Sequence, residues 1–223
     1  RLYCLKGASC RMEITWFGKS CFRLRGRGGS VLTDPFAPEA GYRLPRMAAS
    51  LVTVSHDDEG HNYARIARDN PYVIQGPGEY EVGGVFVIGV ATYHDDKQGA
   101  ERGKNTGYLI EHEEMAICHL GDLGHLPSQE QIEELDGIDI LMIPVGGKEV
   151  LTAARAAEVV NLLEPKLVIP MRFRIADMDK ELATVTRFLN EMNAKEIEPQ
   201  EALRITASQL PDETQVAVLA PRR

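Results

Sequence analysis

Residues 55–61 read Ser-His-Asp-Asp-Glu-Gly-His and follow directly on residues 51–54, an apolar strand-like run of Leu-Val-Thr-Val. Imidazole and carboxylate groups are the protein ligands that zinc, manganese and iron prefer. A loop that carries His56, Asp58 and His61 can turn several such donors toward one point. A solvated acidic loop is the plain alternative. The stretch therefore predicts a metal site at a strand end, provided that donors from elsewhere in the chain converge on it.

Two further groups of histidine and aspartate stand in the same kind of position, directly after an apolar run. Residues 94–96 read His-Asp-Asp, and residues 119–125 read His-Leu-Gly-Asp-Leu-Gly-His. A lone histidine at such a place is more often structural, and His125 is better explained as a loop residue than as a ligand. Three groups at three strand ends are much harder to explain in this way. We therefore expect His94 and Asp122 to approach the first loop.

The order of predicted elements indicates an α+β fold with two layered sheets flanked by helices. Short strands joined by glycine-rich turns fill the first part of the chain, and strands alternate with helices in the second part. A doubly wound sheet would need crossover helices from the start, so it is disfavoured. Strands are predicted at 12–17, 21–25, 30–33, 51–55, 72–74, 79–82, 85–92, 106–111, 115–119, 138–144, 166–170, 202–207 and 214–220, and helices at 62–68, 128–135, 152–163 (capped by Thr152) and 179–193.

Composition limits the classes of partner. The 223 residues carry 25 Lys and Arg against 33 Asp and Glu, a formal net charge of −8. Such a chain lacks the broad basic face that nucleic-acid binding needs. No apolar run approaches the roughly 18 residues of a membrane-spanning helix. The four cysteines form no Cys-x-x-Cys pair, which indicates free thiols and a cytoplasmic location.

The sequence indicates where the folded domain begins. Strand patterning begins at Met12, whereas residues 1–11 lack it and make a poor signal peptide. We expect residues 1–11 to be a disordered leader or added segment. Residues 12–223 are long enough to bury one sizeable core, and they are predicted to form a single domain.

From Met12 to about Arg174 the chain resembles the metallo-β-lactamase superfamily, within it the branch of predicted metal-dependent hydrolases that includes ascorbate-6-phosphate-lactonase-like proteins. The motifs arrive in the family's order: a hairpin turn at 16–22, Asp-Pro-Phe at 34–36, the histidine signature at 55–61, a third-motif histidine at 94, paired strands leading to the aspartate at 122, Pro-Val-Gly-Gly at 144–147 and Ile-Pro-Met at 169–171. Together their order and spacing are specific. The resemblance implies a four-layer αββα sandwich.

Three positions depart from the family pattern of metal ligands. Asp58 stands where the second signature histidine is expected, Gly60 where an aspartate of the second metal is expected, and Arg172 where the final histidine is expected. The resemblance then implies one metal ion at most, zinc or else manganese or iron. The implied metal residues are His56, Asp58, His94 and Asp122, with His61 near them.

The function that the resemblance implies is a metal-dependent hydrolase of a small anionic ester, lactone or phosphoester, acting through a single metal-bound water. Asp122 would orient the water, Arg172 would stabilise developing negative charge, and His61 would be the third catalytic residue. Asp34, directly after a predicted strand, would hydrogen-bond a ligand histidine from behind. Capping a turn is its alternative role.

The alternative function is that of a non-catalytic relative whose site is a binding pocket or a structural remnant. Arg172 would then take the place of metal and pair with Asp58 or Asp122. In the hydrolase, His56 and His94 leave room for a metal ion, whereas in the alternative the Arg172 nitrogen atoms fill that place. The expected partner is a small anionic molecule, with no nucleic acid and no membrane, and a homo-oligomer is left open.

Overall fold

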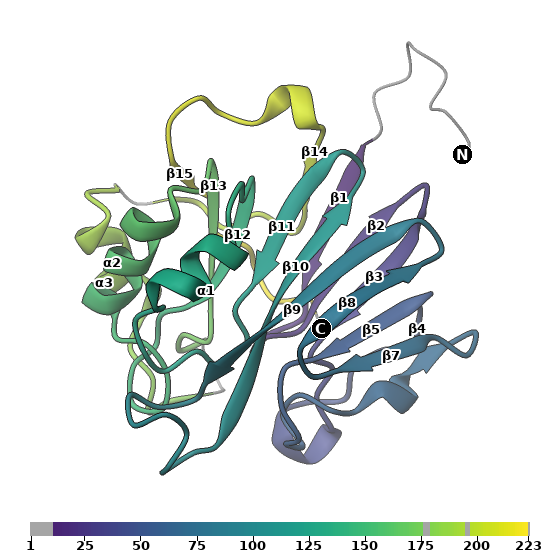
Figure 1. Cartoon of the computed structure of the whole chain (residues 1–223), viewed down its shortest axis with the longest axis horizontal. Helices are drawn as coiled ribbons and strands as arrows, with labels where there is room; N and C mark the ends of the chain where they lie inside the picture. The colour runs from purple at the N-terminus through teal and green to yellow at the C-terminus, as the bar shows by residue number, and fades with distance from the viewer. Residues whose placement is uncertain (1–10, 176–178, 195–196, 223) are drawn as a thin grey trace.

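The computed structural model describes residues 11–175, 179–194 and 197–222, and two β-sheets form its centre (Figure 1). The six-stranded sheet consists, in spatial order, of β14 (Leu203–Ile205), β1 (Met12–Trp16), β2 (Phe22–Gly26), β3 (Gly29–Thr33), β5 (Leu51–Val54) and β7 (Tyr72–Gln75). The seven-stranded sheet consists of β15 (Gln215–Val216), β13 (Leu167–Met171), β12 (Ile140–Pro144), β11 (Met115–His119), β10 (Lys104–His112), β9 (Val85–Tyr93) and β8 (Gly78–Val82).

Helical segments lie outside both sheets, so the predicted layered architecture is confirmed. The α-helices α1 (Gln129–Glu134), α2 (Ala153–Leu163) and α3 (Val185–Glu191) lie beside the seven-stranded sheet, on the left of Figure 1. The other sheet is covered by the short helices η1 (Pro38–Ala40) and η2 (Ala64–Ile66) and by the strand pair β4 (Met47–Ala48) and β6 (Ala67–Arg68). A third short helix, η3 (Ala207–Gln209), follows β14.

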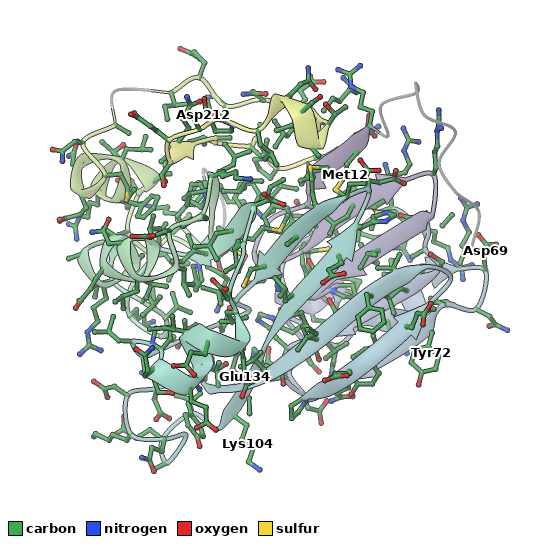
Figure 2. All side chains as sticks on the ribbon, turned by 45° about the horizontal axis from the view of Figure 1, so that its top comes forward. Met12, Asp69, Tyr72, Lys104, Glu134 and Asp212 are labelled. Carbon is green, nitrogen blue, oxygen red and sulfur yellow. The ribbon has the colours of Figure 1, made fainter. Side chains whose placement is uncertain are left out.

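Two apolar clusters hold these layers together. The larger one contains inward residues of both sheets and the buried faces of the α-helices, among them Trp16, Tyr108 and Phe188. The smaller one lies on the outer side of the six-stranded sheet, where Leu32 and Val52 pack against the covering segments. Figure 2 shows side chains filling the space between the layers, while that of Lys104 extends away from the ribbon. Among the described residues, no helix is long and apolar enough to cross a membrane.

The central strands and helix α2 follow directly from their sequences. All five residues of β12 and of β13 are buried, as expected of parallel strands covered on both faces. Pro170 has no N–H to donate, and it lies beyond Leu167 and Val168, the two residues of β13 that pair with β15. Helix α2 begins at the predicted cap, where the Thr152 hydroxyl accepts a hydrogen bond from the Arg155 amide.

Two predicted helices were wrong in extent. Residues 62–68 contain only the single turn η2, because Ile66 and Ala67 are pulled onto the smaller apolar cluster and β6 pairs with β4. The predicted helix 179–193 begins only at Val185, because the Ala183 backbone exchanges hydrogen bonds with Gly146 and Arg174. Of the predicted leader, residues 1–10 lie outside the described residues. Cys21 and Cys118 are buried free thiols, as predicted.

The strand directions bring the three histidine and aspartate groups to one edge of the sandwich. β3 and β5 run parallel to each other. β9 and β11 are both antiparallel to β10, and β11, β12 and β13 are mutually parallel. The ends of β9, β11 and β13 therefore share one edge of their sheet, which is where functional residues gather in layered folds.

Candidate metal centre

The candidate site is built from residues that directly follow the ends of five strands. They are Asp34 after β3, His56, Asp58 and His61 after β5, His94 after β9, Asp122 after β11 and Arg172 after β13. Asp34, His61, His94, Asp122 and Arg172 are buried, His56 is half-buried and Asp58 is exposed. The positions that the sequence singled out thus meet in space.

Asp122 lies at the centre of the site. Its Oδ2 atom is 2.6 Å from Arg172 Nη2, 3.2 Å from His61 Nε2 and 3.6 Å from His94 Nε2. Its Oδ1 atom accepts a hydrogen bond of 3.1 Å from the Ser20 hydroxyl. One carboxylate oxygen therefore faces three nitrogen atoms, of which the His94 nitrogen is too distant for a hydrogen bond.

Asp34 holds the signature loop from behind. Its Oδ1 accepts from the Ser55 amide at 2.7 Å, and its Oδ2 accepts from the Ser55 hydroxyl at 2.6 Å and from His61 Nδ1 at 2.8 Å. The same hydroxyl lies 3.0 Å from His56 Nδ1. Asp34 thus contacts one site histidine directly and a second one through Ser55, in the position that the sequence indicated for it.

Two of the site residues adopt a strained backbone conformation. Asp34 has φ 39° and Arg172 has φ 54°, the left-handed region that side chains with a Cβ enter at a cost. Each follows the last residues of a strand. Strain of this kind clusters at functional sites, because the surrounding structure must hold the residue in place.

The two buried carboxylates are both ionised. Burial alone would raise the pKa of Asp122, but the charges of Arg172 and His61 hold that pKa well below its usual range. Burial also opposes ionisation of Asp34, and the His61 charge together with hydrogen bonds from His61 and Ser55 lowers the Asp34 pKa nonetheless. Opposite charge at short range is the dominant cause in each case.

The histidines divide into one charged and two neutral groups. Burial would lower the pKa of His61, but Asp122 and Asp34 raise it to about 9. Burial, together with the His61 charge, lowers the pKa of His56 to about 4. The pKa of His94 is also lowered, by burial and by the nearby Arg172 charge. Without metal, the buried charges of Asp34 and Asp122 are therefore balanced by His61 and Arg172.

Potential metal donors occur in two groups that share His56. Among the described residues, His56, His94 and Asp122 form one group and His56, Asp58 and His61 form the other, and within each group the donor atoms lie within 4.8 Å of one another. The predicted set joined Asp58 with His94 and Asp122. The structure instead brings Asp58 together with His61, and its Oδ1 accepts from the Gly60 amide at 2.8 Å.

The first of these groups has a donor atom with nothing to bind. His94 Nε2 is buried and has no hydrogen-bond partner among the described residues. Buried polar atoms are nearly always satisfied, so such an atom needs an explanation. A neutral imidazole beside a second imidazole and a carboxylate is a donor set that suits zinc, manganese or iron. The residues present therefore fit one divalent ion.

A cavity of about 350 Å³ opens on the side of the second donor group, beside Asp58 and His61. Asp58, His61 and Arg172 line it, together with Lys19 and Lys148. Lys19 forms an ion pair with Asp179, and Lys148 forms one with Glu181. The volume is at the lower end of the range of about 300–1,000 Å³ that is typical of small-molecule sites.

Two residues around Asp122 escaped the sequence reasoning. Ser20 donates to its carboxylate, and Asn105 Oδ1 accepts from its amide at 3.0 Å. Both are small polar residues in strand or hairpin segments, which carry no ligand signal. His119, the first residue of the third predicted group, lies outside both donor groups and donates from Nε2 to the Ser20 carbonyl at 2.8 Å. His125 lies outside both donor groups, and its Nε2 accepts from the Tyr93 amide.

Known proteins resemble this chain in sequence and in structure. Residues 13–172 match the family model described as the β-lactamase superfamily domain. A predicted Zn-dependent hydrolase of the metallo-β-lactamase superfamily from Thermotoga maritima has a similar structure, with 36% identity, a TM-score of 0.78 and coverage of 93% of this chain and 98% of that one.

Curated relatives from archaea are similar over most of the chain. A UPF0173 protein from Pyrococcus furiosus is 29% identical over 73% of this chain and 83% of its own length. A protein named UPF0173 metal-dependent hydrolase, from Pyrococcus horikoshii, is 27% identical over 73% of this chain and 84% of its own length.

Proposed function

The chain belongs to the metallo-β-lactamase superfamily, and from this premise we propose that it is a metal-dependent hydrolase that binds one divalent ion. The observation that carries the proposal is His94 Nε2, a buried nitrogen without a partner among the described residues, in one donor group with His56 and Asp122. A relative is named a metal-dependent hydrolase, and another is described as a predicted Zn-dependent one. Zinc is therefore the first choice of metal, with manganese and iron as alternatives.

His56, His94 and Asp122 would hold the ion. Asp58 and His61 are further candidate ligands, because they form the second donor group together with His56. A divalent ion bound there supplies Lewis acidity, which polarises a carbonyl or phosphoryl oxygen and makes a water molecule more acidic. All other parts of the proposal concern side chains of this chain.

Asp122, Arg172 and His61 have distinct roles in this proposal. Asp122 orients the attacking water by accepting its hydrogen bond, because a carboxyl group with so low a pKa is a poor base. Arg172 lines the cavity and carries a permanent positive charge, which stabilises negative charge that develops on the substrate. His61 holds a proton on Nε2 at neutral pH in the metal-free protein and is positioned to donate it.

The charge balance favours a small anionic substrate. Among the buried groups of the metal-free site, two carboxylates face two cations, Arg172 and protonated His61, while the carboxylate of Asp58 is exposed. A divalent ion adds two positive charges and one is lost if His61 gives up its proton, so loading adds one positive charge to the buried groups. An ester, lactone or phosphoester with a carboxylate or phosphate group matches that charge. The resemblance to the ascorbate-6-phosphate-lactonase-like branch agrees with a substrate of this kind.

Metal titration and activity assays test this proposal together. Chelator-treated protein is expected to bind one equivalent of zinc per chain and then to hydrolyse members of a panel of small lactones and phosphoesters. His94→Ala is expected to lose both properties, whereas the exposed variant Asp96→Asn keeps them. Two equivalents in the wild-type protein would contradict the single-ion proposal.

One observation favours the alternative of a non-catalytic protein. Arg172 Nη2 lies 2.6 Å from Asp122 Oδ2, so a guanidinium already satisfies the oxygen that a metal would use. A complete failure to bind zinc, manganese or iron would support this second candidate. The buried thiols Cys21 and Cys118 are free, which supports a cytoplasmic location for either function.

A further inference from the structure

We propose that Ser55 fixes the tautomer of His56 by relaying the influence of Asp34, so that one buried carboxylate orients two site histidines. The hydrogen-bond arrangement is a property of the metal-free chain. Its benefit to metal binding rests on the proposed function. Ser55 is thus assigned as a positioning residue, which acts on the donor groups through His56.

The geometry around Asp34 leaves the Ser55 hydroxyl proton one destination. Ser55 Oγ is 2.6 Å from Asp34 Oδ2 and 3.0 Å from His56 Nδ1. An ionised carboxylate only accepts hydrogen bonds, and a serine hydroxyl has a single proton. If that proton pointed at His56, two oxygen lone pairs would face each other at 2.6 Å across the Ser55–Asp34 contact.

Because the hydroxyl donates to Asp34, the contact with His56 requires His56 to be the donor. The proton of the neutral His56 ring therefore lies on Nδ1, and its Nε2 keeps a free lone pair for a ligand. His61 Nδ1 is 2.8 Å from Asp34 Oδ2 but 3.4 Å from Ser55 Oγ, so its proton goes directly to the carboxylate. Both rings thus direct Nε2 away from Asp34, which is how buried partners prepare metal-binding histidines.

Close packing holds Ser55 in the position that the relay needs. The Ser55 carbonyl accepts from the Thr106 amide at 2.9 Å, which ties the residue to β10. Gly121, at φ 57°, approaches so closely that a Cβ placed on it would lie 2.5 Å from Ser55 Cβ. Only a glycine at 121 leaves room for the serine, so the relay depends on two small residues that meet from different sheets.

Imidazole nitrogen-15 spectra of the metal-free protein test the relay without any metal or substrate. The wild-type His56 ring is expected to give the Nδ1–H pattern, with its signals assigned by their loss in His56→Gln. Ser55→Ala is expected to convert His56 to a mixture of tautomers or to Nε2–H. In a zinc competition assay the same variant is expected to bind zinc about 10- to 100-fold more weakly.

Two variants serve as controls. Thr53→Val removes a buried hydroxyl from β5, two residues before Ser55, and Thr53 Oγ1 has no hydrogen-bond partner among the described residues. Ser20→Ala removes a hydroxyl that contacts Asp122 and neither histidine. Both are expected to leave the His56 tautomer unchanged. Thermal unfolding of all three variants shows whether each one folds.

A wild-type His56 ring protonated on Nε2 would overturn the relay, and this measurement needs no variant. A Ser55→Ala protein with the tautomer and zinc affinity of Thr53→Val would overturn it as well. The expected tautomers in a protein that binds no metal would leave the relay standing and would refute the proposed hydrolase instead.

Discussion

The two sides of the Asp122 carboxylate are built on opposite principles. On the side of His94 and His56, the nearest nitrogen is 3.6 Å away and has no partner, and both rings have lowered pKa values. On the side of Arg172 and His61, two cations contact the same oxygen at 2.6 and 3.2 Å. The first side, called here the open side, is prepared to receive a cation, whereas the second, the filled side, contains cations of the protein itself.

The difference teaches that two cationic side chains can compensate a buried carboxylate from one side and leave its other side free. A carboxylate that is fully buried must be compensated, and a guanidinium performs this function permanently. The resemblance implies that Arg172 stands where the family has a ligand histidine, and in our proposal this exchange does not simply damage the site. The guanidinium fixes a positive charge on the filled side, whereas the open side can bind a cation from solution.

The largest expected effect comes from removing the group that both sides share. Asp122→Asn leaves Arg172 and His61 buried without their carboxylate, so the free energy of unfolding should fall by about 3–5 kcal/mol. Urea denaturation of metal-free protein measures this change. The control is Asp96→Asn, which breaks only the exposed pair with Arg155 and should cost less than about 1 kcal/mol. Equal losses in the two variants would remove the basis of the comparison.

The next largest effect is expected from the filled side, in the pH dependence of the free energy of unfolding. The folded-state pKa of His61 is raised to about 9, so its contribution is complete below pH 6.5 and disappears as the pH rises toward 9. Metal-free protein should therefore lose stability across this window in urea titrations at successive pH values. His61→Gln should flatten the decline. The pKa of His56 is lowered to about 4, so titration of His56 changes stability only below pH 6.5, outside this window.

A change confined to the open side should affect binding and hardly affect folding. His94→Ala removes a donor that makes no hydrogen bond among the described residues through Nε2. Zinc affinity should fall by more than the roughly 10- to 100-fold typical of residues that only support a ligand. Competition with a chromogenic chelator measures the affinity, and His125→Gln, outside both donor groups, is the matched variant. Similar zinc affinities for the two proteins would show that the open side is not the binding side.

The smallest expected effect is a gain, the conversion of the filled side into a second metal position. Gly60→Asp with Arg172→His adds a carboxylate and an imidazole in place of the guanidinium. A Cβ on Gly60 would lie 2.9 Å from the exposed Asp58 carboxylate, which can move aside. Zinc stoichiometry should rise from one toward two equivalents, while Gly60→Asp alone stays at one. A double variant that still binds one ion would mean that Arg172 does not occupy a metal position.

Sequence was sufficient for the features that depend on strand ends. His56, His94 and Asp122 follow apolar runs, and parallel strand ends share an edge, so their convergence could be predicted. That Arg172 follows the apolar run 167–171 was equally visible. The grouping of Asp58 with His61 instead of His94 was not, because it depends on how one loop turns after β5.

Other features were hidden because their cause is tertiary. Ser55 has no ligand chemistry of its own, and its importance arises only from contacts with Asp34 and His56. Residues 62–68 have no sequence pattern that forbids a helix. They form a single turn because the outer face of the six-stranded sheet needs an apolar cover.

The shared position of His56 also has a kinetic meaning. Asp58 is exposed, His56 is half-buried, and His94 and Asp122 are buried, so the two donor groups form a gradient of hydration that passes through one ring. In the proposed relay Nδ1 is bound to Ser55, so His56 has a single nitrogen to offer and would serve one donor group at a time. An ion that reaches the exposed group would then pass to the buried group only when the ring changes its partner.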